Sequence, residues 1–159
     1  MPQVEGLGHV GLYVHDVMKQ RDFYTRVLGL KIADEDLARR GGMVFLSADP
    51  EREHHELLLM AGRDVPPGTH MVQQISFRVS SIGELRSFYR LFTKEGVVIE
   101  RAVSHGNALG LYFQDPEGNT VEVYYKTGIP VPQPYSKPID LERMSDEELL
   151  AIGGAALPR

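Results

Sequence analysis

The sequence predicts an α+β fold in which two copies of a β-α-β-β-β unit pair into an open eight-stranded cup with the helices outside. Three observations support this class. A strand-like alternation followed by a helical pattern occurs twice, and three further strand-like runs follow each helix. The motif Arg-x-Phe-Tyr begins at Arg21 and again at Arg86, 65 positions later, and Asp-Pro begins at Asp49 and again at Asp115, 66 positions later. A spacing that persists from the first strand to the last indicates an internal repeat.

The first copy covers about residues 5–61. Residues 6–14 alternate, with Val10, Leu12 and Val14 on one face, which is typical of a strand with one apolar side. A helix follows with its aromatic residues on one side, and Gly29 is placed to end it. The predicted ranges are 17–28 for this helix and 31–34, 43–48 and 54–60 for the remaining strands.

A linker over residues 62–69 contains Pro-Pro-Gly, and the second copy covers about residues 70–128. Each half-sheet has one face covered by its own helix, so the other face needs a partner, and pairing about a pseudo-twofold axis gives the cup. We therefore predict one domain over residues 1–128. In the second copy we predict a helix at 84–94, ended by Gly96, and strands at 74–79, 97–99, 109–113 and 120–125.

The tail, residues 129–159, differs from both copies. Four prolines between residues 129 and 139 predict an extended arm. Residues 140–152 predict a short helix with Ser145 as its N-cap, and residues 153–159 are expected to fray. We expect the arm to wrap its own domain or a second subunit.

Composition narrows the classes of function. A length of 159 residues fits a domain with a sizeable core, and a net charge of −5 argues against nucleic acid or an anionic membrane as a partner. The chain has no cysteine, so any metal would take oxygen and imidazole ligands. The N-terminal residues lack a basic segment followed by an apolar one, and no run is long enough to span a membrane, so we expect a cytoplasmic protein.

Glu122 is the first candidate for a functional residue. It lies between Val121 and Val123 in a predicted strand, where a carboxylate is costly unless a cation compensates its charge. The repeat makes His9 and Gln74 one pair of neighbours across the axis, and Glu56 and Glu122 the other. Nitrogen and oxygen donors without sulfur suit a divalent Fe, Mn, Ni, Co or Zn ion. The alternatives are a hydrogen-bonded strand histidine, a polar glutamine in the cup and a solvent-facing glutamate.

Two further histidines are candidates. In His54-His55-Glu56, neighbouring side chains of a regular strand face opposite ways, so His55 and Glu56 both enter the cup only if a bulge intervenes. His105 lies in a glycine-containing loop that leads to the strand with Tyr112, and loops near the mouth of a cup often carry function.

These motifs resemble the vicinal oxygen chelate superfamily, which includes glyoxalase I, bleomycin-resistance proteins and type I extradiol catechol dioxygenases. The resemblance covers about residues 5–128. It rests on the repeat and on the segments Gly-Leu-Gly-His9-Val, Phe23-Tyr24-x3-Leu28-Gly29 and Asp115-Pro116-x-Gly118-Asn119-x2-Glu122.

Within the superfamily the chain looks most like extradiol dioxygenases, which implies Fe(II) or Mn(II) held by two His and one Glu. His9 and Glu122 match two of the ligands, and the third position, a His in that pattern, is Gln74 here. His55 matches the second-sphere acid/base. Tyr112 matches a tyrosine that hydrogen-bonds the catecholate. His105 corresponds to the active-site loop histidine.

The resemblance therefore implies a metal-dependent dioxygenase-like enzyme, an oxidoreductase, that acts on a small aromatic diol or related vicinal-oxygen compound. One alternative is a glyoxalase-like isomerase or lyase that uses Ni, Zn or Co, with Glu56 as a ligand and Glu56 or Glu122 as the base. Another is a metal-free protein that binds a small molecule, as bleomycin-resistance proteins do. A homodimer or higher homo-oligomer is expected for this architecture.

Overall fold

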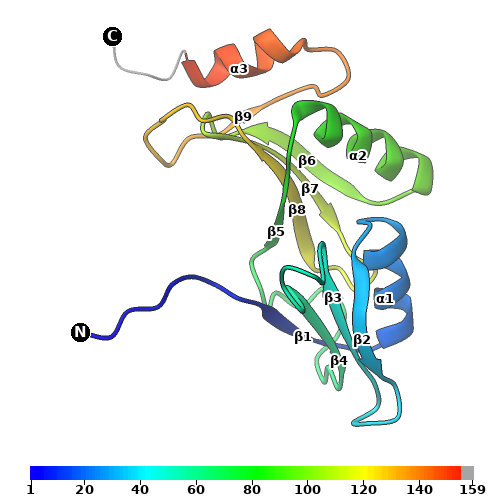
Figure 1. Cartoon of the computed structure of the whole chain (residues 1–159). Coiled ribbons are helices and arrows are strands. Elements are labelled where there is room, and N and C mark those ends of the chain that lie inside the picture. Colours follow the sequence, from blue (N-terminus) through cyan, green and yellow to red (C-terminus); the bar gives the residue numbers. More distant parts are fainter. Residues whose placement is uncertain (155–159) are drawn as a thin grey trace. The chain divides into compact units, whose positions relative to one another are not determined.

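The structure is a computed structural model that describes residues 1–154, and these divide into two units, residues 1–69 and 70–154 (Figure 1). Each unit contains one copy of the predicted β-α-β-β-β order. The α+β class and the repeat are therefore confirmed, with a four-stranded sheet in the first unit and a five-stranded sheet in the second. The pairing of the two copies into one cup stays a prediction.

The first unit begins with β1 (Val10–Val14) and α1 (Val17–Arg26), and continues with β2 (Lys31–Asp36), β3 (Met43–Ser47) and β4 (Leu57–Ala61). The sheet order is β1-β4-β3-β2, with β1 parallel to β4 and the other pairs antiparallel. Asp16 caps α1 by accepting a hydrogen bond from the Lys19 backbone N–H at 2.9 Å. Alternate residues of the strands are fully buried, including Val14, Val44, Leu46, Leu57 and Leu59, and α1 packs on β3 and β4.

The second unit repeats this order with β5 (Ile75–Val79), α2 (Ile82–Glu95), β6 (Ile99–Ser104), β7 (Ala108–Gln114) and β8 (Thr120–Lys126). Its sheet order is β5-β8-β7-β6-β9, where β9 (Lys137–Pro138) comes from the tail. Leu85 and Phe92 of α2 are fully buried, and the Phe92 ring lies 4.3 Å from that of Phe113, between ring centroids. Val121 and Val123 of β8 are also buried, which leaves Glu122 on the opposite face of the strand.

Several boundaries differ from the predicted ones. The strand predicted at residues 6–14 begins only at Val10, and α2 begins two residues earlier than predicted because Ser81 caps it, accepting from the Glu84 N–H at 3.1 Å. The strand predicted at residues 97–99 is the longer β6, which starts where the sequence pattern ends. The tail helix, α3 (Asp146–Gly154), includes two of the residues expected to fray, and residues 155–159 lie outside the described part of the chain.

The strand register corrects one equivalence drawn from the motif spacing. Gly11 pairs with Leu58 in the first sheet, and Ser76, 65 positions after Gly11, pairs with Glu122 in the second. Leu58, not Glu56, is therefore the structural counterpart of Glu122. The connection between β3 and β4 (residues 48–56) is longer than that between β7 and β8 (residues 115–119), and this difference shifts the register of the last strand.

The tail packs on the second unit. β9 pairs with the edge of β6, and Leu141 and Leu149 are fully buried. The guanidinium of Arg86 on α2 donates to the carbonyls of Leu141 and Met144 and pairs with Asp146 at 2.7 Å. In the described residues no helix is long and apolar enough to cross a membrane.

Arg86 is expected to hold the tail against α2. The substitution Arg86→Met removes donors to two backbone carbonyls and should destabilise the docked tail by about 2–3 kcal/mol, since hydrogen bonds to charged groups are the stronger ones. Amide hydrogen exchange of α3 measures the change. Arg90→Met is the matched control, because Arg90 forms only an exposed pair with Glu142, worth about 1 kcal/mol or less. Equal protection of α3 in both variants would contradict this role for Arg86.

Candidate functional site

The second sheet places four polar side chains in one row across four strands. Ser76 of β5 pairs with Glu122 of β8, Glu122 pairs with Tyr112 of β7, and Tyr112 pairs with Arg101 of β6. Paired residues on neighbouring strands point to the same face, so the row lies on the face opposite the buried valines of β8. Periodicity alone predicted the place of Glu122 but not this row.

Glu122 is 5% exposed, and its carboxylate is held by neutral donors. Ser76 Oγ donates to Oε2 at 2.5 Å, and Gln74 Nε2 donates to the same oxygen at 3.0 Å. The other carboxylate oxygen occupies the space above Gly110, where an added Cβ would lie 2.3 Å from it. Within residues 70–154 no cation forms an ion pair with Glu122, so its charge is buried among neutral partners.

Tyr112 lies next to Glu122 and is 4% exposed. Burial, followed by the neighbouring Glu122 carboxylate, raises the pKa of Tyr112 to about 12. Arg101 opposes this rise, because its guanidinium carbon lies 3.8 Å from the centroid of the Tyr112 ring. The phenol is therefore neutral at physiological pH and has one proton to donate.

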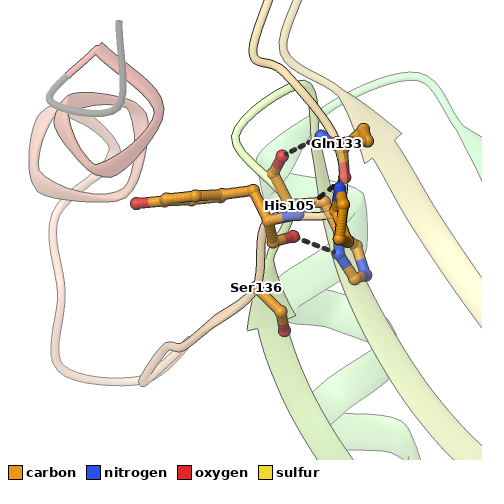
Figure 2. A pocket seen from close by; sticks show the side chains of 5 residues that line it. His105, Gln133 and Ser136 are labelled. Carbon is orange, nitrogen blue, oxygen red and sulfur yellow. Dashed lines mark hydrogen bonds between the residues drawn. The ribbon is translucent and has the colours of Figure 1, made fainter.

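His105 extends this group of side chains toward the tail. Its Nε2 lies 3.1 Å from the Tyr112 hydroxyl, and its Nδ1 lies 2.9 Å from the carbonyl oxygen of Tyr135. His105, Gln133 and Ser136 line an open hollow of about 600 Å³. Figure 2 shows His105 beside Gln133 in the wall of this hollow. Gln74, Glu122, Tyr112 and His105, four of the predicted site residues, thus form one hydrogen-bonded group within the second unit.

The first unit brings together His9 and His55. Their rings lie 4.2 Å apart between centroids, and the Nδ1 atoms of His54 and His55 are 3.0 Å apart. The Phe45 ring lies edge-on to both His54 and His55. Burial, followed by electrostatic interaction with His9 and His54, lowers the pKa of His55 below its usual value, which favours the neutral imidazole.

The hydrogen bond of the Glu56 side chain goes to a residue outside this histidine pair. Its carboxylate accepts a hydrogen bond from the Ala48 N–H at 2.8 Å and so closes the connection between β3 and β4. Of the two adjacent candidates it is therefore His55 that contacts His9. The ligand role predicted for Glu56 stays a prediction.

Neither unit, over the described residues 1–154, gathers three or more His, Asp or Glu side chains in a group that could hold a metal ion. Sequence reasoning missed Ser76, Arg101 and Gln133. A serine two residues after Gln74 in an alternating strand carried a signal, because it shares a face with Gln74. No comparable local pattern marks Arg101 or Gln133, whose contacts depend on register and on the path of the tail.

Residues 6–123 match the family described as the Glyoxalase/Bleomycin resistance protein/Dioxygenase superfamily. The chain belongs to this family. The resemblance drawn from the motifs is thereby confirmed.

Several curated relatives carry dioxygenase names. The chain is 28% identical over 119 residues to biphenyl-2,3-diol 1,2-dioxygenase 2 and 30% identical over 122 residues to biphenyl-2,3-diol 1,2-dioxygenase 3, both of Rhodococcus globerulus. These matches cover 72% and 74% of this chain but only 60% and 61% of the relatives. A manganese-dependent 2,3-dihydroxybiphenyl 1,2-dioxygenase from Geobacillus genomosp. 3 is 26% identical over 126 residues, 77% of this chain and 37% of that protein. The chain thus spans about three fifths of the first two.

Solved structures share the fold. A glyoxylase/bleomycin resistance protein/dioxygenase domain from Frankia sp. EAN1pec matches with a TM-score of 0.66 and 19% identity, over 78% of this chain and 99% of that one. An integron cassette protein from the mobile metagenome of the Halifax Harbour sewage outfall matches with a TM-score of 0.60 and 27% identity, over 77% and 99%. The fosfomycin resistance protein FosX of Listeria monocytogenes matches with 0.60 and 19%, over 77% and 94%.

The raised pKa of Tyr112 gives a direct test of the site. In metal-free protein Glu122→Gln removes the negative charge beside the phenol, so the Tyr112 pKa should fall below its value of about 12 while staying above 10, because the phenol remains buried. The 13Cζ resonance of Tyr112, assigned with Tyr112→Phe, follows the titration. Glu100→Gln is the control, since Glu100 contacts Arg101 rather than Tyr112.

The raised pKa of Tyr112 also determines how the free energy of unfolding changes with pH. The folded state keeps the Tyr112 proton up to higher pH than the unfolded chain does, so its contribution to the free energy of unfolding is present below pH 10 and is lost between about pH 10 and 12. A Tyr112 pKa unchanged by Glu122→Gln would contradict the assigned cause.

Proposed function

We propose that the protein is a divalent-metal-dependent, dioxygenase-like enzyme that acts on a small aromatic diol or related vicinal-oxygen compound. The observation that carries the proposal is the buried Glu122 carboxylate, which is held by neutral donors beside Tyr112 and His105. A buried anion of this kind favours a cation as a further partner. The names of the curated relatives support a diol as the substrate class.

In this proposal His9 joins Gln74 and Glu122 as a ligand. The set of an imidazole, an amide and a carboxylate is free of sulfur and fits Fe(II) or Mn(II), and the manganese-dependent relative supports this choice. When bound, the metal supplies Lewis acidity that makes the diol hydroxyl groups easier to deprotonate. We further propose that the enzyme works as a homodimer or higher oligomer in the cytoplasm.

The remaining roles belong to side chains of this chain. The imidazole of His55 accepts a proton from the substrate and returns it later, and its lowered pKa keeps the ring unprotonated before that transfer. The Tyr112 phenol, neutral well above physiological pH, positions a substrate oxygen by hydrogen bonding. We propose no ligand role for Glu56 here: its carboxylate accepts a hydrogen bond from the Ala48 N–H, and this contact disfavours the glyoxalase-like alternative that needs Glu56 as a ligand.

Reconstitution with Fe(II) or Mn(II) under anaerobic conditions, followed by a panel of catechols and dihydroxybiphenyls in air, tests the activity. We expect metal-dependent formation of a yellow, ring-opened product from at least one diol. A protein that binds aromatic compounds but retains neither metal and opens no ring would overturn the proposal and favour the metal-free binding alternative.

Gln74 should weaken metal binding, because a neutral amide is a poorer ligand than imidazole for Fe(II). We expect Gln74→His to bind Fe(II) about tenfold more tightly or better, as measured by competition with a chelator. Gln73→His makes the same chemical change at the preceding, exposed position and should leave the affinity unchanged. Equal affinities of the two variants would argue that Gln74 lies outside the metal site.

His55 should matter far more than its neighbour. We expect His55→Gln to lower kcat by about 10²- to 10⁴-fold, the usual contribution of a general acid or base. His54→Gln removes an exposed ring that contacts His55 and should cost less than about tenfold. Steady-state rates on the best diol of the panel compare the two variants. A similar decrease of kcat in both variants would contradict a specific role for His55.

A further inference from the structure

The loop that carries His105 is fixed by the tail rather than by the sheet alone. The loop is closed by its own backbone, since His105 N–H donates to the Ala108 carbonyl at 2.8 Å. Tail residues 131–136, here called the strap, then cross over it. Val131 packs on Gly106 so closely that an added Cβ at this glycine would lie 2.5 Å from its side chain. Thr127, just before the strap, donates to the Gly106 carbonyl at 2.6 Å.

The strap determines which nitrogen of His105 carries the proton. A backbone carbonyl only accepts hydrogen bonds, so the contact of 2.9 Å with the Tyr135 oxygen requires a proton on Nδ1. In the neutral ring Nε2 then carries a lone pair and accepts the proton of the Tyr112 hydroxyl, 3.1 Å away. Without the carbonyl of Tyr135, nothing at Nδ1 would favour this tautomer.

The side chain of Gln133 links that carbonyl to the loop. The Gln133 amide donates from Nε2 to the His105 carbonyl at 2.8 Å and accepts at Oε1 from the Tyr135 N–H at 3.1 Å. Both hydrogen bonds are drawn in Figure 2, where Gln133 lies directly against His105. The amide thus links the backbone of the loop to the backbone of the strap.

The tautomer has a consequence for Glu122. Tyr112 has one proton and two neighbouring acceptors, His105 Nε2 and the Glu122 carboxylate. If His105 carried its proton on Nε2, the phenol would turn its own proton toward Glu122. The Nδ1–H tautomer draws that proton to His105 and leaves the carboxylate to Ser76 and Gln74.

We propose that Gln133 is a positioning residue: by anchoring the strap it holds neutral His105 in the Nδ1–H tautomer, so that Nε2 accepts from Tyr112 and the Glu122 carboxylate stays available as a ligand. The last clause rests on the proposed function, whereas the tautomer itself does not.

The test is 15N NMR of the histidine side chains in the full-length, metal-free chain, at a pH where His105 is neutral. The ring nitrogen shifts separate the tautomers, and His105→Gln identifies the His105 signals. We expect a protonated Nδ1 and an unprotonated Nε2 in the wild type. In Gln133→Ala the ratio should move about three- to tenfold toward the Nε2–H form, as expected for the loss of neutral hydrogen bonds.

Ser136→Ala is the matched control, because Ser136 lines the same hollow without bonding to His105 or Gln133, and it should keep the wild-type ratio. A wild-type His105 protonated on Nε2 would overturn the proposal even if no variant folds. A folded Gln133→Ala protein with the wild-type ratio would overturn it as well. Because neither metal nor substrate is present, failure of the proposed activity cannot produce either result.

Discussion

The parallel register between β5 and β8 is the constraint on which the candidate site depends. It sets Ser76 opposite Glu122, and the antiparallel pairing of β8 with β7 then sets Tyr112 beside the same carboxylate. A slip of one residue would turn the Glu122 carboxylate toward the face of the buried valines, away from its donors Ser76 and Gln74. A buried charge is tolerated only when hydrogen bonds replace its lost hydration, so register and chemistry are fixed together here.

Much of the fold could be predicted from local patterns, because alternation and helical periodicity are properties of short segments. The face on which Glu122 lies followed from its valine neighbours in the same way. The equivalence of Glu56 with Glu122 failed because the spacing between motifs does not show how many residues lie in the connection between two strands. The roles of Ser76 and Arg101 depend on which strands become neighbours, and that of Gln133 on where a proline-rich tail crosses the sheet. These are long-range contacts, which no single stretch of sequence encodes.

The two units share an element order but carry different chemistry. The first presents rings, with His55 against His9 and Phe45. The second unit carries the Glu122 carboxylate and its hydrogen-bond donors Ser76 and Gln74. A repeated scaffold therefore does not repeat its function, and the activity has to be argued from the side chains rather than from the family fold. This matters because the fold is shared by a glyoxylase/bleomycin resistance protein/dioxygenase domain and by a fosfomycin resistance protein.

The short strand β9 has a consequence beyond the site. It lies along the edge of β6, where Val103 pairs with Pro138 and Ser104 with Lys137. Proline has no N–H to offer, and a lysine on a rim discourages close approach by another apolar strand. Along this stretch β9 occupies the hydrogen-bonding edge of β6, so a strand from another molecule cannot pair with β6 there. The tail segment that contacts His105 therefore also disfavours edge-to-edge aggregation.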